Sequence, residues 1–273
     1  MSGRKVLRSA LIVLAVGLFA ACGTSRVLES YPDREIERPL TLPKGLSVWS
    51  PIIVAARNDN IATQGGASAV DMSFSFYPWY WELGLTDRFT LIWFPIPLAA
   101  RYSVLRHARG ELAVAFNLIG EPYYRRWDFD WSPYFEVLTR NHISTGAAVE
   151  TRFLAQADVR RSGDPLSGTL SWELGSRFQL NSLVAVRPYL EPGLEFGSPR
   201  ARYLGSLPPA DSRSPHFRLP LGAKLNWQFA NLGKRPSAGA TNLELAADIR
   251  WLDWTYPDEY RSFQSILRVN YFF

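Results

Sequence analysis

The feature that most constrains this chain is a two-residue alternation of apolar and polar side chains that runs for 9 to 13 residues at a time. Between 217 and 229 every odd position is apolar, from Phe217 to Phe229, whereas the even positions are almost all polar. Successive side chains of a β-strand point to opposite faces, so such a strand has one apolar and one polar face. The pattern recurs over residues 127–137, 170–180, 184–196, 243–251 and 263–273.

The length of these runs separates two classes of β protein. Strands of globular proteins average about 5–6 residues, whereas a tilted transmembrane strand needs about 9–11. Aromatic residues such as Trp127, Trp227 and Trp251 stand near the strand ends, where interfacial girdles lie. We therefore predict an all-β fold, an antiparallel up-and-down transmembrane β-barrel, and keep a soluble β-sandwich as the alternative.

We expect about twelve strands, with 10 and 14 as alternative counts because Pro78, Pro95 and Pro97 interrupt the early part. The expected strands span residues 45–56, 68–83, 88–94, 98–105, 111–120, 127–139, 142–154, 168–180, 183–196, 215–229, 241–253 and 260–273. Short links at 106–110, 140–141 and 181–182 alternate with long links at 57–67, 156–167 and 197–214. Bacterial barrels have short periplasmic turns and long outer loops, so both ends of the barrel domain are expected on the periplasmic side.

The N-terminus has the layout of a secretory signal peptide. Basic residues at positions 4, 5 and 8 precede an uncharged run over 10–20 and small residues before Cys22, the only cysteine. As a helix this run spans roughly 16 Å, well short of the roughly 30 Å hydrocarbon core. A single cysteine also excludes a disulfide framework within the chain.

The residues Leu18-Phe19-Ala20-Ala21-Cys22 resemble the lipobox of bacterial lipoproteins. The resemblance implies cleavage before Cys22 and lipid attachment there, and Gly23 in place of an Asp implies the outer membrane as destination. We expect a signal peptide over 1–21, a lipid-anchored flexible tether over 22–43 and a barrel over 44–273.

The last residues, Val269-Asn270-Tyr271-Phe272-Phe273, resemble the C-terminal signal that outer-membrane barrels present to their assembly machinery. The implied partners are therefore outer-membrane lipids, the lipoprotein-processing machinery and the barrel-assembly machinery. The implied location is the bacterial outer membrane, with the lipid anchor on the periplasmic side.

The ionisable residues of the polar face are expected to line the lumen. The acids are Asp128, Asp130, Glu136, Glu150, Glu173, Glu191, Glu195, Glu244 and Asp248, and the bases are Arg101, Arg152, Arg177, Arg187, Arg218, Lys224, Arg250 and Arg268. Acids and bases are close to balance, so the count predicts no charge selectivity. The whole chain carries a formal charge of +5, of which the signal peptide takes 3, and no basic patch for nucleic acid follows.

A barrel of this size either holds a narrow channel or is filled by side chains. Passage of small solutes and a structural or binding role are thus both open. Asp128 and Asp130, two residues apart on one face, are a minor hypothesis for cation binding. The three histidines are widely separated, so we expect no metal site and no cofactor.

One stretch bears on catalysis. His142-Ile143-Ser144-Thr145-Gly146, with Gln156 downstream, is similar to the pattern of outer-membrane phospholipase A. The resemblance implies Ser144 as nucleophile, His142 as base and Gln156 as the residue that orients the base. Thr145 and Gln156 stand where that family has Asn, so the primary expectation is no catalytic residue, with a phospholipase-like hydrolase as the weaker alternative.

Overall fold

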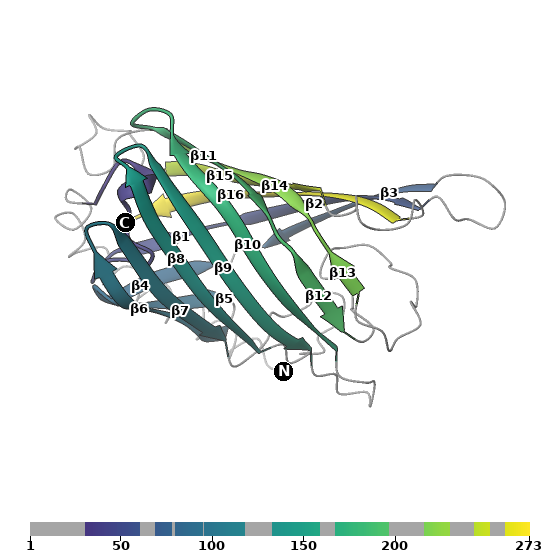
Figure 1. Cartoon of the computed structure of the whole chain (residues 1–273), viewed down its shortest axis with the longest axis horizontal. Helices are drawn as coiled ribbons and strands as arrows, with labels where there is room; N and C mark the ends of the chain where they lie inside the picture. The colour runs from purple at the N-terminus through teal and green to yellow at the C-terminus, as the bar shows by residue number, and fades with distance from the viewer. Residues whose placement is uncertain are drawn as a thin grey trace, which may run out of the picture.

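The computed structural model describes residues 31–60, 69–77, 80–94, 96–117, 133–158, 167–196, 216–229, 243–251 and 260–273. Its strands form one antiparallel sheet that closes on itself, because the last strand, β16 (Tyr260–Phe272), pairs with β1 (Ser47–Trp49) and β2 (Ile52–Asn60) (Figure 1). The only helix among these residues is the 3-10 turn η1 (Glu35–Glu37). None of the described helical structure has the length and apolar character needed to cross a membrane.

Twelve strands surround the lumen, as expected. Four of them consist of two segments: β1 with β2, β3 (Ala69–Tyr77) with β4 (Trp81–Thr86), β11 (Val184–Leu190) with β12 (Gly193–Phe196), and β13 (His216–Arg218) with β14 (Leu221–Gln228). The others are β5 (Phe89–Phe94), β6 (Ile96–His107), β7 (Gly110–Asn117), β8 (Tyr134–Ser144), β9 (Ala147–Asp158), β10 (Ser167–Gln179), β15 (Leu243–Trp251) and β16. Pro51, Pro192 and Pro220 stand at three of the breaks, because proline has no N–H to give to the sheet.

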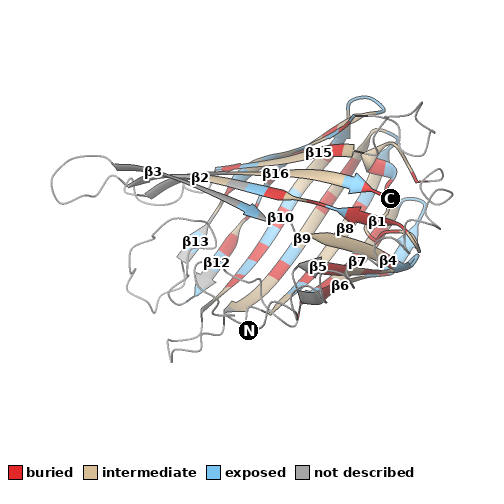
Figure 2. Cartoon of the chain, turned by 180° about the vertical axis from the view of Figure 1, so that it is seen from behind, coloured by how far each residue is buried: buried red, intermediate tan, exposed pale blue. Residues whose placement is uncertain are grey.

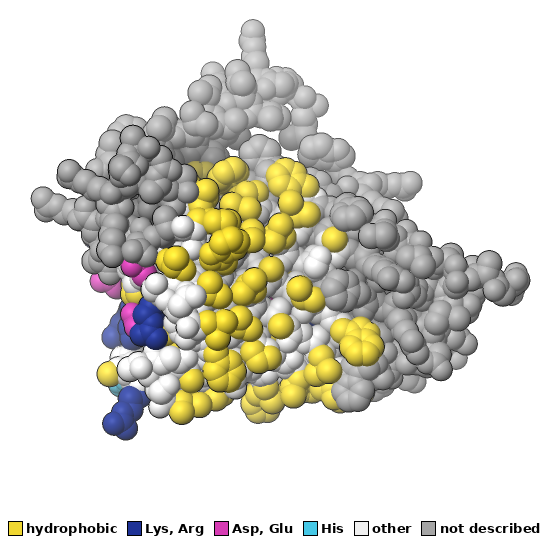
Figure 3. Space-filling view, turned by 90° about the horizontal axis from the view of Figure 1, so that it is seen from above, with side chains coloured by type: hydrophobic (Ala, Val, Ile, Leu, Met, Phe, Trp, Pro, Cys, Tyr) yellow, Lys and Arg dark blue, Asp and Glu magenta, His cyan; other side chains and the backbone are white. Residues whose placement is uncertain are grey.

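The alternation in the sequence corresponds to the two faces of the barrel wall. Along β10, Trp172 is 53% exposed and its neighbour Glu173 is 1% exposed, and similar bands of burial cross the other strands (Figure 2). Apolar side chains form a broad band on the outer surface, with charged side chains at one of its edges (Figure 3). Exposed apolar residues around a charged interior invert the pattern of a soluble protein, so the sandwich alternative is wrong.

One expected turn is wrong. We placed a link at 140–141, but β8 continues to Ser144, and the turn lies at 145–146. Arg140 faces the lumen, where its Nε donates to Glu150 Oε1 at 2.6 Å, so the strand does not end there. The other two short links, between β6 and β7 and between β10 and β11, are confirmed. We call the end of the barrel that carries these turns the short-turn end.

Both ends of the barrel domain meet at the short-turn end. The backbone N–H of Ser47 donates to Phe273 O at 2.9 Å, and the N–H of Phe273 donates back to Ser47 O at 3.0 Å. The chain therefore enters and leaves the barrel on one side. The long links fall largely outside the described residues.

The expected flexible tether is wrong for the part that the structure describes. Residues 31–46, here called the N-terminal plug, lie inside the short-turn end of the barrel, with Ile36, Arg38, Thr41 and Leu42 buried. The plug lacks sequence periodicity because its partners are residues of the barrel wall far along the chain. Residues 1–30, including Cys22, lie outside the described residues.

Candidate functional site in the lumen

The backbone of the plug is held by side chains from the lumen wall. Three N–H groups donate to the wall: Ile36 to Gln179 of β10 at 3.1 Å, Leu40 to Glu111 of β7 at 2.7 Å and Leu42 to Thr90 of β5 at 2.7 Å. In return, Arg101 of β6 donates to the carbonyl of Leu40 at 3.1 Å. A buried segment without regular structure must satisfy its backbone groups in this way. The plug therefore spans the mouth from one wall to the other.

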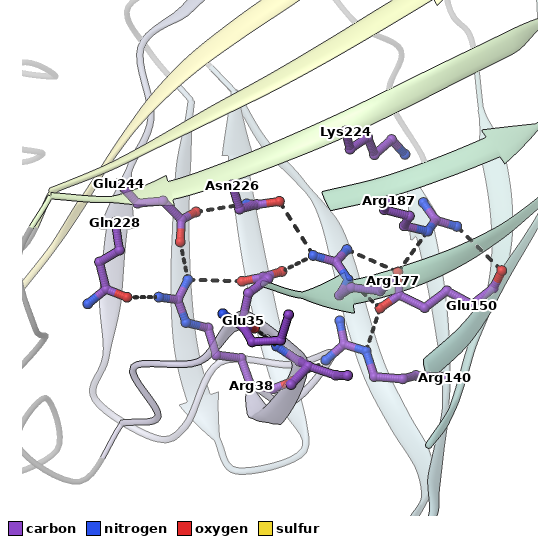
Figure 4. Close-up of polar contacts among 12 residues, drawn as sticks. Glu35, Arg38, Arg140, Glu150, Arg177, Arg187, Lys224, Asn226, Gln228 and Glu244 are labelled. Atoms are coloured by element: carbon purple, nitrogen blue, oxygen red, sulfur yellow. Dashed lines mark hydrogen bonds and ion pairs between the residues drawn. The ribbon is translucent and has the colours of Figure 1, made fainter. Parts of the chain in front are cut away.

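Arg38 is the ionic centre of the plug (Figure 4). Its guanidinium donates to Glu35 within the plug at 2.9 Å, to Gln228 of β14 at 2.7 Å, and to Glu244 of β15. Burial alone lowers the pKa of this guanidinium, but the carboxylates of Glu244 and Glu35 outweigh burial and raise it above its usual value. Arg38 therefore stays charged, and its charge ties the plug to two strands.

Glu150 of β9 gathers three arginines beside the plug. Its carboxylate accepts from Arg140 at 2.6 Å and Arg177 at 2.7 Å, and Arg187 lies 2.9 Å away. Arg177 also reaches Glu35 of the plug at 2.8 Å. Buried charges are tolerated only when paired. Wall and plug thus form one continuous ionic network.

A second cluster centres on Glu173, four residues before Arg177 in β10 and thus farther from the short-turn end. Glu173 accepts two hydrogen bonds from Lys224 Nζ, at 2.7 and 3.0 Å, and pairs with Arg187. Arg152 Nη1 lies 3.8 Å from it. The side chains of Arg152 and Lys224 are 30% and 23% exposed, whereas that of Glu173 is 1% exposed.

Tyr189 lies between glycines on the two neighbouring strands. The register sets Tyr189 of β11 opposite Gly175 of β10 and Gly222 of β14. A Cβ at Gly222 would lie 2.3 Å from the tyrosine ring, so only glycine leaves room for it. The phenol donates to Asp248 at 2.6 Å and accepts from Arg250 at 2.9 Å. Tyr189 thereby links β11 to β15 across the intervening strand β14.

The structure places most of the candidate lumen residues in ion pairs and hydrogen bonds of the barrel wall. Those whose described side chains make contacts within the lumen are Arg101, Glu136, Glu150, Arg152, Glu173, Arg177, Arg187, Glu191, Lys224, Glu244, Asp248 and Arg250. Arg268 lies over the ring of Tyr80, 5.3 Å from its centroid. Asp128 and Asp130 lie outside the described residues, as do the side chains of Glu195 and Arg218.

Sequence reasoning missed several residues of the site. Glu35 and Arg38 belong to the plug, where no alternation gives a signal, and Arg140 was assigned to a turn. Glu111 was detectable, because it shares a face with the buried Ala113 and Ala115 of β7. Its partners could not be known before the plug was placed.

The three residues of the phospholipase-like pattern do not meet. Gln156 pairs with Tyr134 at one end of β8, whereas His142 and Ser144 lie at the other end, opposite Ala148 and Ala147. The eight positions between Tyr134 and His142 correspond to roughly 27 Å at about 3.4 Å per residue. Gln156 therefore does not orient His142 in this structure. The described residues also contain no group of three or more side chains suited to hold a metal ion.

No protein-family model matches the sequence, and no curated protein matches it. Among solved structures, an outer membrane channel from Pseudomonas putida F1 is 12% identical, with a TM-score of 0.51 over 85% of this chain and 97% of that one. The translocator domain of the autotransporter NalP from Neisseria meningitidis is 13% identical, with a TM-score of 0.44 over 97% of each chain. The first similarity shows a shared fold, the outer-membrane β-barrel.

Proposed function

We propose that the protein is a bacterial outer-membrane channel for small solutes, and that its own N-terminal plug closes the periplasmic mouth in the state described. The observation that carries the proposal is the plug itself, which crosses the short-turn end and bonds to opposite walls. Bacterial outer-membrane barrels have their short turns at the periplasmic end, which supports a periplasmic position for the plug. Any solute that crosses the lumen would have to pass the plug.

The bonding of the plug supports a closure that can open. Between 33 and 41 the plug is held mainly by ion pairs and hydrogen bonds, such as those of Arg38 and Leu40. These groups would exchange their partners for water on release, so each bond contributes only about 0.5–1.5 kcal/mol net, somewhat more where a charge takes part. Apolar packing is concentrated next to β1, in the cluster of Tyr31, Leu42, Leu46, Val48 and Phe272. Residues 42–46 would then act as the fixed root of a movable segment.

A structural or binding barrel is the second candidate. The observation that favours it is the Glu150 cluster, in which three arginines and a carboxylate fill space beside the plug. In that case the plug and the wall network are permanent packing, and the barrel conducts nothing.

The lipid anchor belongs to the same proposal. Cys22 of the lipobox-like segment stands nine residues before Tyr31, and nine residues span at most about 30 Å. Tyr31 packs near Phe272 at the short-turn end, with ring centroids 5.8 Å apart, so a lipid on Cys22 could reach the inner leaflet. Metabolic labelling with palmitate should mark the wild type and not Cys22→Ser, and equal labelling of both would refute the anchor.

The channel is tested by single-channel recording in planar bilayers. Wild type and Arg38→Ala are compared, with Lys44→Ala as the matched control, because the Lys44 side chain is an exposed plug residue. We expect rare or small openings for wild type and for Lys44→Ala, and longer or larger openings for Arg38→Ala. A heat-dependent shift in gel mobility verifies that each barrel is folded. Folded protein that is silent in all three forms would favour the structural barrel.

A further inference from the structure

The acids and bases of the lumen differ in how far they reach into water. The bases Arg101, Arg152 and Lys224 have side chains that are 22%, 30% and 23% exposed. The acids that they pair with, Glu82, Glu136 and Glu173, are 14%, 10% and 1% exposed. The order is reversed in the pair of Asp248 and Arg250, whose side chains are 17% and 8% exposed. At the first three pairs a solute in the lumen therefore meets the cation first, although the count of charges along the sequence is balanced.

The cause is the difference in side-chain length. Lysine and arginine carry their charge at the end of a long stem, whereas a carboxylate stays close to the backbone. In the Glu173 cluster, the carboxylate lies under Lys224, with Arg187 beside it and Arg152 Nη1 3.8 Å away. In this cluster the bases cover the acid, so Arg152 and Lys224 are the charges that face the lumen here.

Arg152 and Lys224 keep hydrogen-bond donors that their partner carboxylates do not use. Arg152 donates from Nε to Glu136 at 3.0 Å and from Nη2 to the same carboxylate. Its Nη1 is 3.8 Å from Glu173, beyond hydrogen-bond range, so no described carboxylate satisfies Nη1. Lys224 has three donors, and Glu173 accepts two of its bonds. The two cations reach one shared carboxylate, so they stand close enough to bind one small anion together.

Arg101 extends the layer to β6, three strands from Arg152 of β9 in the barrel wall. In the register, Arg101 of β6 faces Ala115 of β7, and Ala115 faces Glu136 of β8, the partner of Arg152. Ala115 is small and fully buried, so it puts no long side chain between Arg101 and Glu136 in this row. The cations thus form a band across several strands.

We infer that the lumen on the outer side of the plug takes small organic anions, carboxylates of about the size of succinate, with Arg152 and Lys224 as the primary contacts. The inference deepens the proposed function, because it names the class of solute for the same lumen. A planar, forked guanidinium and a lysine ammonium are the groups that proteins use to bind carboxylates.

Two measurements on the same purified protein in detergent test the inference. Isothermal titration compares succinate with 1,4-diaminobutane, a cation of the same length. Planar bilayers then give the reversal potential in a potassium chloride gradient. The proteins are wild type, Arg152→Gln, Lys224→Gln and the control Arg109→Gln, whose side chain is exposed in the turn between β6 and β7.

We expect wild type and Arg109→Gln to bind succinate in preference to the diamine and to pass chloride in preference to potassium. Each lumen substitution should weaken succinate binding and reduce the chloride preference about threefold, the effect of one unit charge about 7 Å away in water. Arg152→Lys should retain most of the succinate binding and most of the chloride preference, because it keeps the positive charge.

The outcomes separate the inference from the proposed function. Succinate binding without conductance supports the anion site and refutes the channel. Conductance with cation preference and no succinate binding refutes the anion site and supports the channel. Binding that is equal in wild type and both lumen variants also refutes the assignment to Arg152 and Lys224.

Discussion

The two ionic layers of the lumen are built from the same residue types on neighbouring strands, yet they differ in exposure. Beside the plug, Arg140 and Arg177 have side chains that are 6% and 8% exposed. Farther along the lumen, Arg152 and Lys224 are 30% and 23% exposed. The plug contacts the first layer through Glu35 and the carbonyl of Arg38 and leaves the second in contact with water. A lumen arginine that the plug covers thus serves as structural packing, whereas one that stays in contact with water can bind a solute.

Removing Arg38 should release the plug from the first layer. The arginines of that layer should then become as exposed to water as those of the second layer. Arg38→Ala leaves the buried carboxylate of Glu244 and the half-buried carboxylate of Glu35 without this partner, and loss of one partner of a buried pair such as Arg38 and Glu244 costs about 3–5 kcal/mol. We expect the plug to leave the mouth while the barrel stays closed. Limited trypsin digestion should then cleave after Arg34 much faster than in wild type, with Lys44→Gln as control. Equal cleavage in Arg38→Ala and wild type would show that the plug does not depend on this charge.

A smaller displacement is expected from Gly84→Ala. A Cβ on Gly84 of β4 would lie 2.0 Å from the carbonyl oxygen of Pro43 and 2.7 Å from that of Leu42, both backbone atoms of the plug. The root of the plug must shift, at a cost of about 1–3 kcal/mol. The control Gly146→Ala adds a Cβ whose nearest neighbour is 3.9 Å away.

The measurement for Gly84→Ala is again the rate of cleavage after Arg34, together with open time in bilayers. Both should rise in Gly84→Ala and stay at the wild-type value in Gly146→Ala. If the two alanine variants behave alike, the close approach of plug and β4 does not govern closure.

Tyr189→Phe should affect the wall of the second layer and spare the plug. The substitution removes the hydrogen bond to Asp248 and the one from Arg250, a loss of about 1–2 kcal/mol. We expect a lower midpoint of urea unfolding in detergent, with no change in cleavage after Arg34. Tyr102→Phe, on an exposed tyrosine of β6, is the matched control and should leave both unchanged. Faster plug cleavage in Tyr189→Phe would mean that the two layers are coupled.

Ser144→Ala should have the smallest effect of the four. Ser144 is exposed at the end of β8, and such surface substitutions change stability by about 0.5 kcal/mol or less. Fatty acid release from phospholipid micelles should equal the buffer background for wild type and variant. If the wild type released fatty acid and Ser144→Ala did not, the result would support the phospholipase-like hydrolase alternative.

The barrel was predictable from the sequence because its signal is local. The side chains of a strand alternate with a period of two whatever its neighbours are, so residues such as Trp172 and Glu173 reveal their faces without knowledge of the fold. The number of strands, the short turns after His107 and Gln179 and most lumen residues follow from that period. The link predicted at 140–141 is wrong because a polar residue that faces the lumen, such as Arg140, resembles the start of a turn.

The sequence by itself determined the twelve strands, the apolar outer belt and the near balance of lumen charge, since these depend on order and composition along the chain. The tertiary structure alone decided the plug and the exposure of each charge. Glu244 lies more than 200 positions after Arg38 and is one of its buried partners, and Lys224 and Glu173 lie on strands that β11 separates. Such pairs are created by barrel closure and strand register, which bring distant residues together and set which charge covers which.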